Sequence, residues 1–156
     1  MTQPHAAGDS EGRAHFTWPF EVRDYECDLQ GIVNNAVYLH YLEHARHQFL
    51  KQAGISFAAL SKAGVNLVVV RAEIDYKAPL RSGNRFTVGL RMERLSPVRF
   101  QFLQEIRRLD GARQTLILTS RFVCAAMDAR GRPMIPKTLE PLFERHSPGQ
   151  ADGQGR

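Results

Sequence analysis

The stretch DYECDLQGIVNNAVY, residues 24–38, determines how we expect the chain to fold. It is typical of a loop, because it contains Gly31 and the polar pair Asn34-Asn35. It continues into residues 36–53, which contain no glycine or proline, and Gly54 follows. Apolar residues recur there at spacings of three and four, as in an amphipathic helix: Leu39, Leu42, Ala45, Phe49 and Ala53. The loop is therefore expected at the N-terminus of the longest helix.

The remainder of the chain is expected to form mainly strands. Residues 16–22 alternate apolar and polar side chains around Pro19, which indicates an edge strand. Further alternation follows residue 65, and Asp110-Gly111 indicates a tight turn before a long strand over 112–127. Short helices are expected near residues 56–63 and 138–145. The order predicts an α+β domain with a five-stranded antiparallel sheet, one face on the helix and the other solvated or covered by another subunit.

Composition limits the class of protein. Residues 15–146 are expected to form a single domain, with disordered tails over 1–14 and 147–156. The two cysteines show no disulfide or CxxC spacing, there is no signal peptide, and no apolar run approaches membrane-spanning length. We therefore expect a soluble, cytoplasmic protein without a membrane partner. The net charge of +5 suits anionic ligands, but no nucleic-acid motif is present.

Asp28 lies where a carboxylate can act chemically. It precedes Gly31 in a loop that runs into a helix N-terminus, where backbone N–H groups are unpaired and the helix dipole favours negative charge. Those groups can stabilise a carbonyl oxygen as it gains charge, while Asp28 attacks the carbonyl carbon or activates water. The structural alternative is that Asn34 or Asn35 caps the helix and Asp28 closes a turn. Sequence alone leaves both open.

A longer motif resembles a known family. The pattern Asp28-x-x-Gly31-Ile32-Val33-x-x-x-x-Tyr38, continued by Tyr41-Leu42-Glu43-x-Ala45-Arg46, is similar to hotdog-fold acyl-CoA thioesterases, nearest to the 4-hydroxybenzoyl-CoA thioesterase branch. Residues 75–83 resemble a second signature, and the likeness spans roughly residues 16–130. It implies a sheet wrapped around one long central helix, and dimers or tetramers with active sites at the dimer interface. It also implies hydrolysis of acyl-CoA to free acid and CoA without a cofactor.

The resemblance assigns the site residues. Asp28 is expected to be the general base or nucleophile, and backbone amides around Asn35 the oxyanion donors, with the Asn35 side chain holding water or the carbonyl. The other residues expected to bind substrate lie in the same loop or carry cations for the coenzyme's phosphates: Gly31, Ile32, Val33, Asn34, Ala36, Tyr38, Arg71, Lys77 and Arg81.

The loop has no histidine. One bacterial branch carries a histidine near the position of Asn35, and acyl-carrier-protein thioesterases have one in a His-Val-Asn-Asn run where this chain has Ile32. Other hotdog functions therefore stay open: an acyl-carrier-protein thioesterase, a dehydratase (which usually needs a histidine) or a non-catalytic acyl binder. A more remote alternative is a zinc metallohydrolase, because His40-x-x-Glu43-His44 matches a metalloprotease pattern and His47 shares that face. We expect no metal.

Overall fold

The long helix forms where the periodicity predicts it. The computed structural model describes residues 16–144, and in it α1 runs over Asn35–Gln52. The predicted tails, 1–14 and 147–156, lie outside the described residues. No helix within residues 16–144 is long and apolar enough to span a membrane.

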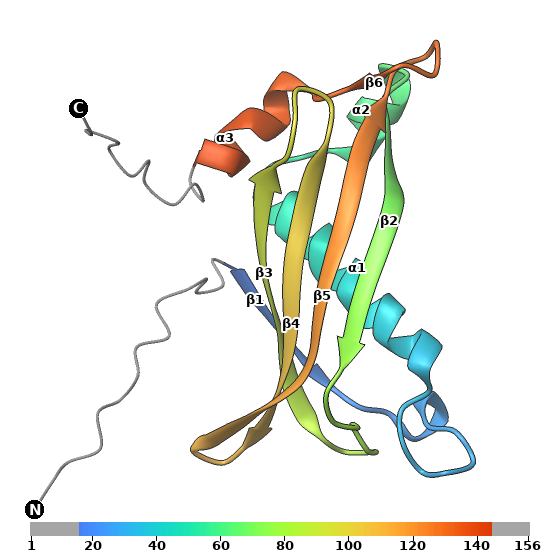
Figure 1. The fold of residues 1–156 in the computed structure, drawn as a ribbon, viewed down its shortest axis with the longest axis vertical. Helices are drawn as coiled ribbons and strands as arrows, with labels where there is room; N and C mark the ends of the chain where they lie inside the picture. Colours follow the sequence, from blue (N-terminus) through green and yellow to red (C-terminus); the bar gives the residue numbers. More distant parts are fainter. Residues whose placement is uncertain (1–15, 145–156) are drawn as a thin grey trace, which may run out of the picture.

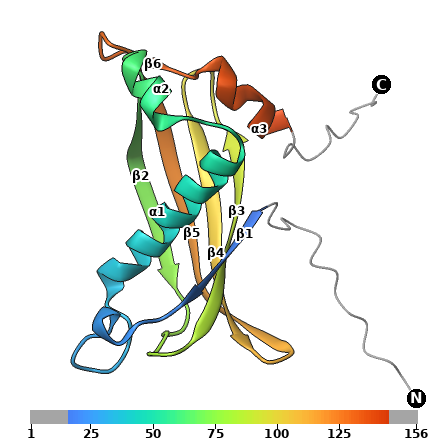
Figure 2. The ribbon, with the colours of Figure 1, turned by 180° about the vertical axis from the view of Figure 1, so that it is seen from behind.

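The strands form one antiparallel sheet, and α1 lies across one face of it (Figure 1, Figure 2). Its strands are β1 (Phe16–Glu21), β2 (Asn66–Tyr76), β3 (Arg85–Arg94), β4 (Phe100–Asp110), β5 (Arg113–Met127) and β6 (Pro133–Met134). The order is β1-β3-β4-β5-β2, so β2 and β1 form the two edges. The edge position predicted from Pro19 is confirmed. The predicted count of five strands is wrong by one, because the two-residue β6 also pairs with β5.

Short elements complete the fold. They are the 3-10 helices η1 (Asp24–Glu26) and η2 (Lys137–Leu139) and the α-helices α2 (Phe57–Lys62) and α3 (Glu140–Glu144). Pro141 lies in the first turn of α3, where its missing N–H costs no helical hydrogen bond. The turn predicted at Asp110-Gly111 joins β4 to β5, and Gly111 has a φ of 63° that favours glycine.

The face of α1 that packs on the sheet differs from the predicted apolar stripe. Leu39 is 39% exposed, whereas Arg46 is only 8% exposed. The predicted polar side chains His40, Glu43 and His44 are exposed. The buried face includes Leu42, Ala45 and Phe49 of the predicted stripe, and it adds Tyr38, Tyr41, Arg46 and Leu50. The apolar pattern therefore identified part of this face and missed its tyrosines and arginine, which also bury apolar surface.

Arg46 is held under the sheet by a polar pair rather than by a carboxylate. Its Nη1 donates to Gln104 Oε1 at 2.9 Å, and Gln104 Nε2 donates to the Leu42 carbonyl at 2.9 Å. The guanidinium lies over the Phe122 ring, 4.2 Å from its centroid. Burial lowers the pKa of Arg46. Gln104 of β4 is therefore bonded to α1 twice, once through the buried Arg46 guanidinium and once through the Leu42 carbonyl.

The outer face of the sheet is polar. Charged side chains there pair both along and across strands: Arg91 Nε lies 3.0 Å from Glu93 Oε1 within β3, and Arg121 Nη1 of β5 lies 3.7 Å from Glu73 Oε2 of β2. Gln101 binds both rows, donating to Glu93 and accepting from Arg121. Of the two sequence alternatives for this face, a solvated surface fits these side chains without a covering subunit.

We expect Gln104→Leu to destabilise the fold. The substitution keeps the volume but leaves the buried Arg46 guanidinium without its acceptor, so the free energy of unfolding should fall by about 2–3 kcal/mol. Urea denaturation measures the change, and Gln114→Leu, at an exposed position of β5, is the matched control. Equal stability of the two variants would show that the Arg46–Gln104 bond contributes nothing net.

Candidate active site

The segment before α1 folds into a tight turn around Asp28. The Asp28 N–H donates to the Ile32 carbonyl at 2.9 Å, and the Gly31 N–H donates to the Asp28 carbonyl at 3.0 Å. Gly31 has a φ of 74°, a conformation that side chains disfavour. Val33 then donates to the Leu80 carbonyl at 2.8 Å, which ties the turn to the β2–β3 loop.

One carboxylate oxygen of Asp28 accepts a hydrogen bond within this turn, and the other has no partner in the described residues. Oδ1 accepts the Gln30 N–H at 2.8 Å, so the turn-closing role considered for Asp28 is confirmed. Within the described residues, Oδ2 takes part in no hydrogen bond or ion pair. The side chain is exposed. A structural role and a chemical role are therefore compatible, because they use different oxygens.

A second turn in the same chain shows what is particular to Asp28. Asp128 repeats the arrangement, with Oδ1 accepting the Arg130 N–H at 2.8 Å and its carbonyl accepting the Gly131 N–H at 2.9 Å. There, however, Oδ2 accepts from Arg132 Nε at 3.0 Å. The two aspartates share a turn and differ in whether the second oxygen is occupied.

The N-terminus of α1 has one backbone donor to spare. Asn34 is the N-cap: its Oδ1 accepts the Ala36 N–H at 2.9 Å, its carbonyl accepts the Val37 N–H at 2.9 Å, and its own N–H donates to Glu26. The capping role is thus confirmed for Asn34. The N–H of Asn35 takes part in no hydrogen bond within the described residues, and the helix dipole adds partial positive charge there.

Two tyrosines hold this terminus from the side. Tyr76 Oη, at the end of β2, donates to the Asn35 carbonyl at 3.0 Å. Tyr38 Oη, on the first turn of α1, accepts the Leu80 N–H at 3.0 Å. The rings meet edge to face, with centroids 5.5 Å apart. Burial raises the pKa of Tyr38, so its phenol stays neutral.

These groups surround a pocket of about 500 Å³. It brings together six of the predicted residues: Asp28, Ile32, Val33, Asn35, Tyr38 and Lys77. It also contains Tyr76, Ala78 and Pro79, which were not among the predicted site residues. All three belong to residues 75–83, the stretch that resembles a second family signature, so the resemblance points to them as well.

Five predicted binding residues do not line this pocket. Gly31 forms part of the Asp28 turn, and Asn34 caps α1 by accepting the Ala36 N–H. Arg71 lies on β2 with its Nη2 2.5 Å from Glu73 Oε1. Arg81 uses its backbone N–H to bind Asn84 Oδ1 at 2.8 Å. Of the three predicted cations, Lys77 alone is at the pocket.

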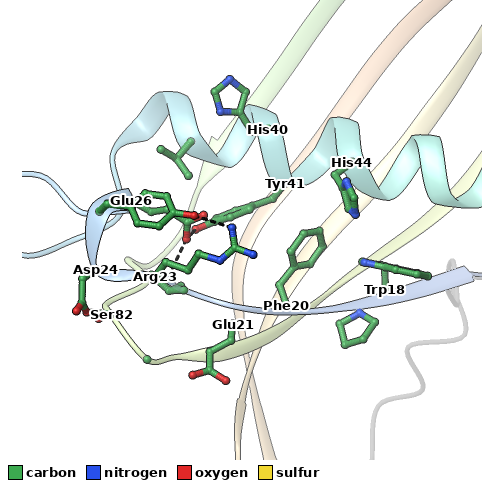
Figure 3. A pocket seen from close by; sticks show the side chains of 15 residues that line it. Trp18, Phe20, Glu21, Arg23, Asp24, Glu26, His40, Tyr41, His44 and Ser82 are labelled. Carbon is green, nitrogen blue, oxygen red and sulfur yellow. Dashed lines mark hydrogen bonds between the residues drawn. The ribbon is translucent and has the colours of Figure 1, made fainter.

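A larger pocket, about 1040 Å³, lies between β1 and α1 and contains neither Asp28 nor Asn35 (Figure 3). Figure 3 shows His44 of α1 lying opposite Phe20 and Trp18 of β1. At its other end, Glu26 Oε2 accepts the Arg23 N–H at 2.8 Å and the Tyr41 hydroxyl at 2.6 Å. Its acidic side chains are all engaged, since Asp24 accepts from the Ser82 hydroxyl and Glu21 pairs with Arg85. The smaller pocket, in contrast, contains Asp28, whose Oδ2 has no partner in the described residues.

The helix histidines do not converge. His44 packs edge to face on Trp18 and Phe20, at centroid distances of 6.1 and 5.7 Å. Figure 3 shows His40 one turn away and pointing out of this cluster. Within residues 16–144, no three or more His, Cys, Asp or Glu side chains are grouped to hold a metal ion. The zinc alternative gains no support from this arrangement.

Comparison with solved structures places the fold. A 1,4-dihydroxy-2-naphthoyl-CoA thioesterase from Synechocystis superposes with a TM-score of 0.76 at 23% identity, over 85% of this chain and 98% of that one. At this identity the likeness shows the fold alone.

Sequence comparison places the family. A chloroplastic acyl-acyl carrier protein thioesterase of Arabidopsis thaliana is 42% identical over 79% of this chain, which spans only 65% of that relative's length. The acyl-CoA thioester hydrolase YbgC of Escherichia coli is 26% identical, over 83% of this chain and 96% of that protein. The model of the thioesterase-like superfamily matches residues 22–143. Because this match covers most of the chain, the protein belongs to the thioesterase-like superfamily.

Proposed function

We propose that the protein hydrolyses the thioester of an acyl-CoA, giving free acid and CoA, in the pocket between Asp28 and Asn35. The observation that carries this proposal is that Asp28 and Asn35 line the same pocket, and that each has a group without a partner in the described residues, the Asp28 Oδ2 and the Asn35 N–H. A nucleophile or base facing an oxyanion donor is the combination that acyl transfer to water requires.

In this mechanism the thioester oxygen accepts the Asn35 N–H. Negative charge develops on that oxygen when water adds to the carbonyl carbon, and the donor stabilises it more in the transition state than in the substrate. Asp28 takes the proton from water, the C–S bond breaks, and the thiolate leaves and is protonated. The Asn35 side-chain amide, which also lines the pocket, is suited to hold the water. The alternative is direct attack by Asp28 to form a mixed anhydride.

Two thiol carriers are candidates for the substrate, coenzyme A and acyl-carrier protein. Lys77 lies in the pocket lining, as the phosphates of CoA would require, and YbgC acts on acyl-CoA. Acyl-carrier protein is the second candidate, because the relative at 42% identity is named for that substrate. A dehydratase is not favoured by any residue of the pocket, whose lining contains no histidine.

We also propose that the active protein is a dimer or tetramer with active sites at the dimer interface. The edge strand β2 exposes Val69 by 49%, Val70 by 43% and Tyr76 by 51%. A long apolar edge strand with unpaired backbone groups favours pairing with another chain. Because Tyr76 and Lys77 belong to the pocket, a second copy at this edge would cover the site. We therefore expect the second subunit at the β2 edge, and not on the outer face of the sheet, because that face is polar.

We expect Asp28→Asn to fold normally and to lose about 99% of kcat or more, because Asn cannot act as base or nucleophile. A thiol-release assay over a panel of acyl-CoA and acyl-carrier-protein substrates measures it. Asp128→Asn alters the same turn far from the pocket and should retain wild-type activity. A folded Asp28→Asn enzyme with more than a few per cent of kcat would move catalysis to another residue.

A single turnover in ¹⁸O-water separates the two roles of Asp28. General-base hydrolysis should place the label in the product acid, and we expect this result because the Asn35 amide can hold the water. Mass spectrometry of the peptide containing Asp28 checks the alternative. Label on that peptide would establish direct attack while leaving the hydrolase proposal intact.

Light scattering in dilute solution should give at least twice the mass of one chain. Val69→Lys, which places a charge on the exposed edge of β2, should shift the population toward monomer and lower activity in parallel. The matched surface control is Leu95→Lys, an exposed apolar residue after β3. A fully active wild-type monomer would contradict shared active sites.

A further inference from the structure

Tyr76 connects the edge strand β2 to the start of α1. It is the last residue of β2, and its hydroxyl donates to the Asn35 carbonyl, 41 positions earlier in the chain, at 3.0 Å. The ring is half exposed, so burial does not explain why a tyrosine, rather than phenylalanine, stands there. The polar atom makes a specific contact with the residue that supplies the free N–H.

The peptide group between Asn35 and Ala36 is bound at both ends. Tyr76 binds its carbonyl, and Asn34 Oδ1 accepts its N–H at 2.9 Å. On the other side of Asn35, the Asn34 carbonyl accepts the Val37 N–H at 2.9 Å. These bonds fix the backbone before and after the Asn35 α-carbon, and the one N–H that they leave free is that of Asn35.

Tyr76 is itself held in place. Its ring packs edge to face on Tyr38 at 5.5 Å and 70°. Tyr38 accepts the Leu80 N–H, and the Leu80 carbonyl in turn accepts the Val33 N–H at 2.8 Å. Strand β2, the loop after it, the Asp28 loop and α1 are thus joined in one closed set of contacts around the pocket.

We infer that Tyr76 is a positioning residue of the proposed thioesterase: it holds Asn35 so that its N–H meets the thioester oxygen. This inference rests on the proposed function. Because a hydrogen bond to the oxygen strengthens as charge develops, loosening its donor should lower kcat more than it changes KM. A residue that only stabilised the fold would instead lower stability and leave the kcat of the folded enzyme unchanged.

Tyr76→Phe tests this inference in the full-length protein. It keeps the ring against Tyr38 and removes the hydroxyl. We expect kcat to fall roughly tenfold, less than full loss of an oxyanion donor, with KM within about twofold and the melting temperature unchanged. Tyr25→Phe is the matched control, since it also removes one hydroxyl contact, that with Arg23, from a ring outside the pocket.

A double-mutant cycle adds a second readout. Asn34→Ala removes the other bond to the same peptide group, so its effect on kcat should be non-additive with that of Tyr76→Phe. The effects of Tyr25→Phe and Asn34→Ala should add. An active wild type whose Tyr76→Phe variant keeps full kcat overturns the inference alone. A wild type that releases thiol from no acyl thioester overturns the proposed function, and the catalytic role of Tyr76 with it.

Discussion

A helix cannot satisfy the backbone N–H groups of its own first turn, and the site is organised around that constraint. At the start of α1 the Asn34 side chain and carbonyl bind two of these donors. Tyr76 and Tyr38 tie the same turn to β2 and to the β2–β3 loop. What remains is one N–H, on Asn35, a residue that lines the same pocket as Asp28. The donor is available for chemistry because its neighbours are all bound.

The paired turns at Asp28 and Asp128 show that local geometry does not decide function. Both aspartates accept an N–H two residues ahead and precede a glycine with a φ of 74°. Asp128 accepts a hydrogen bond from Arg132 Nε on its second oxygen, so that oxygen is engaged in an ion pair. Asp28 differs in its surroundings, because it lines a pocket together with Asn35, the first residue of α1. Chemistry therefore follows from what the fold brings to the turn.

The packing of α1 against the sheet helps to hold the Asp28 and Asn35 backbone in place at the pocket. The helix packs through aromatic rings and through Arg46, whose charge is satisfied by Gln104 of β4 and by the face of Phe122. The opposite face of the sheet is a network of paired charges that needs no cover. The edge strand β2, beside the pocket, exposes Val69, Val70 and Tyr76. The assembly that we propose and the candidate site therefore share one edge of the molecule.

The sequence by itself determined the order of elements, the edge position of the first strand and the proximity of Asp28 to Asn35. Periodicity indicates which side chains face a core, so it is enough to predict the helices and strands. Asp28 and Asn35 are only seven positions apart, so their proximity also follows from the local sequence. Tertiary structure alone showed that Tyr38, Tyr41 and Arg46 belong to the buried face of α1, and which distant residues complete the pocket. Tyr76 reaches Asn35 because β2 crosses beside α1, a contact that no local pattern encodes. Arg71 was predicted to bind substrate, but it lies five positions from Tyr76 in β2. Because side chains alternate across a strand, the two residues lie on opposite faces of the sheet.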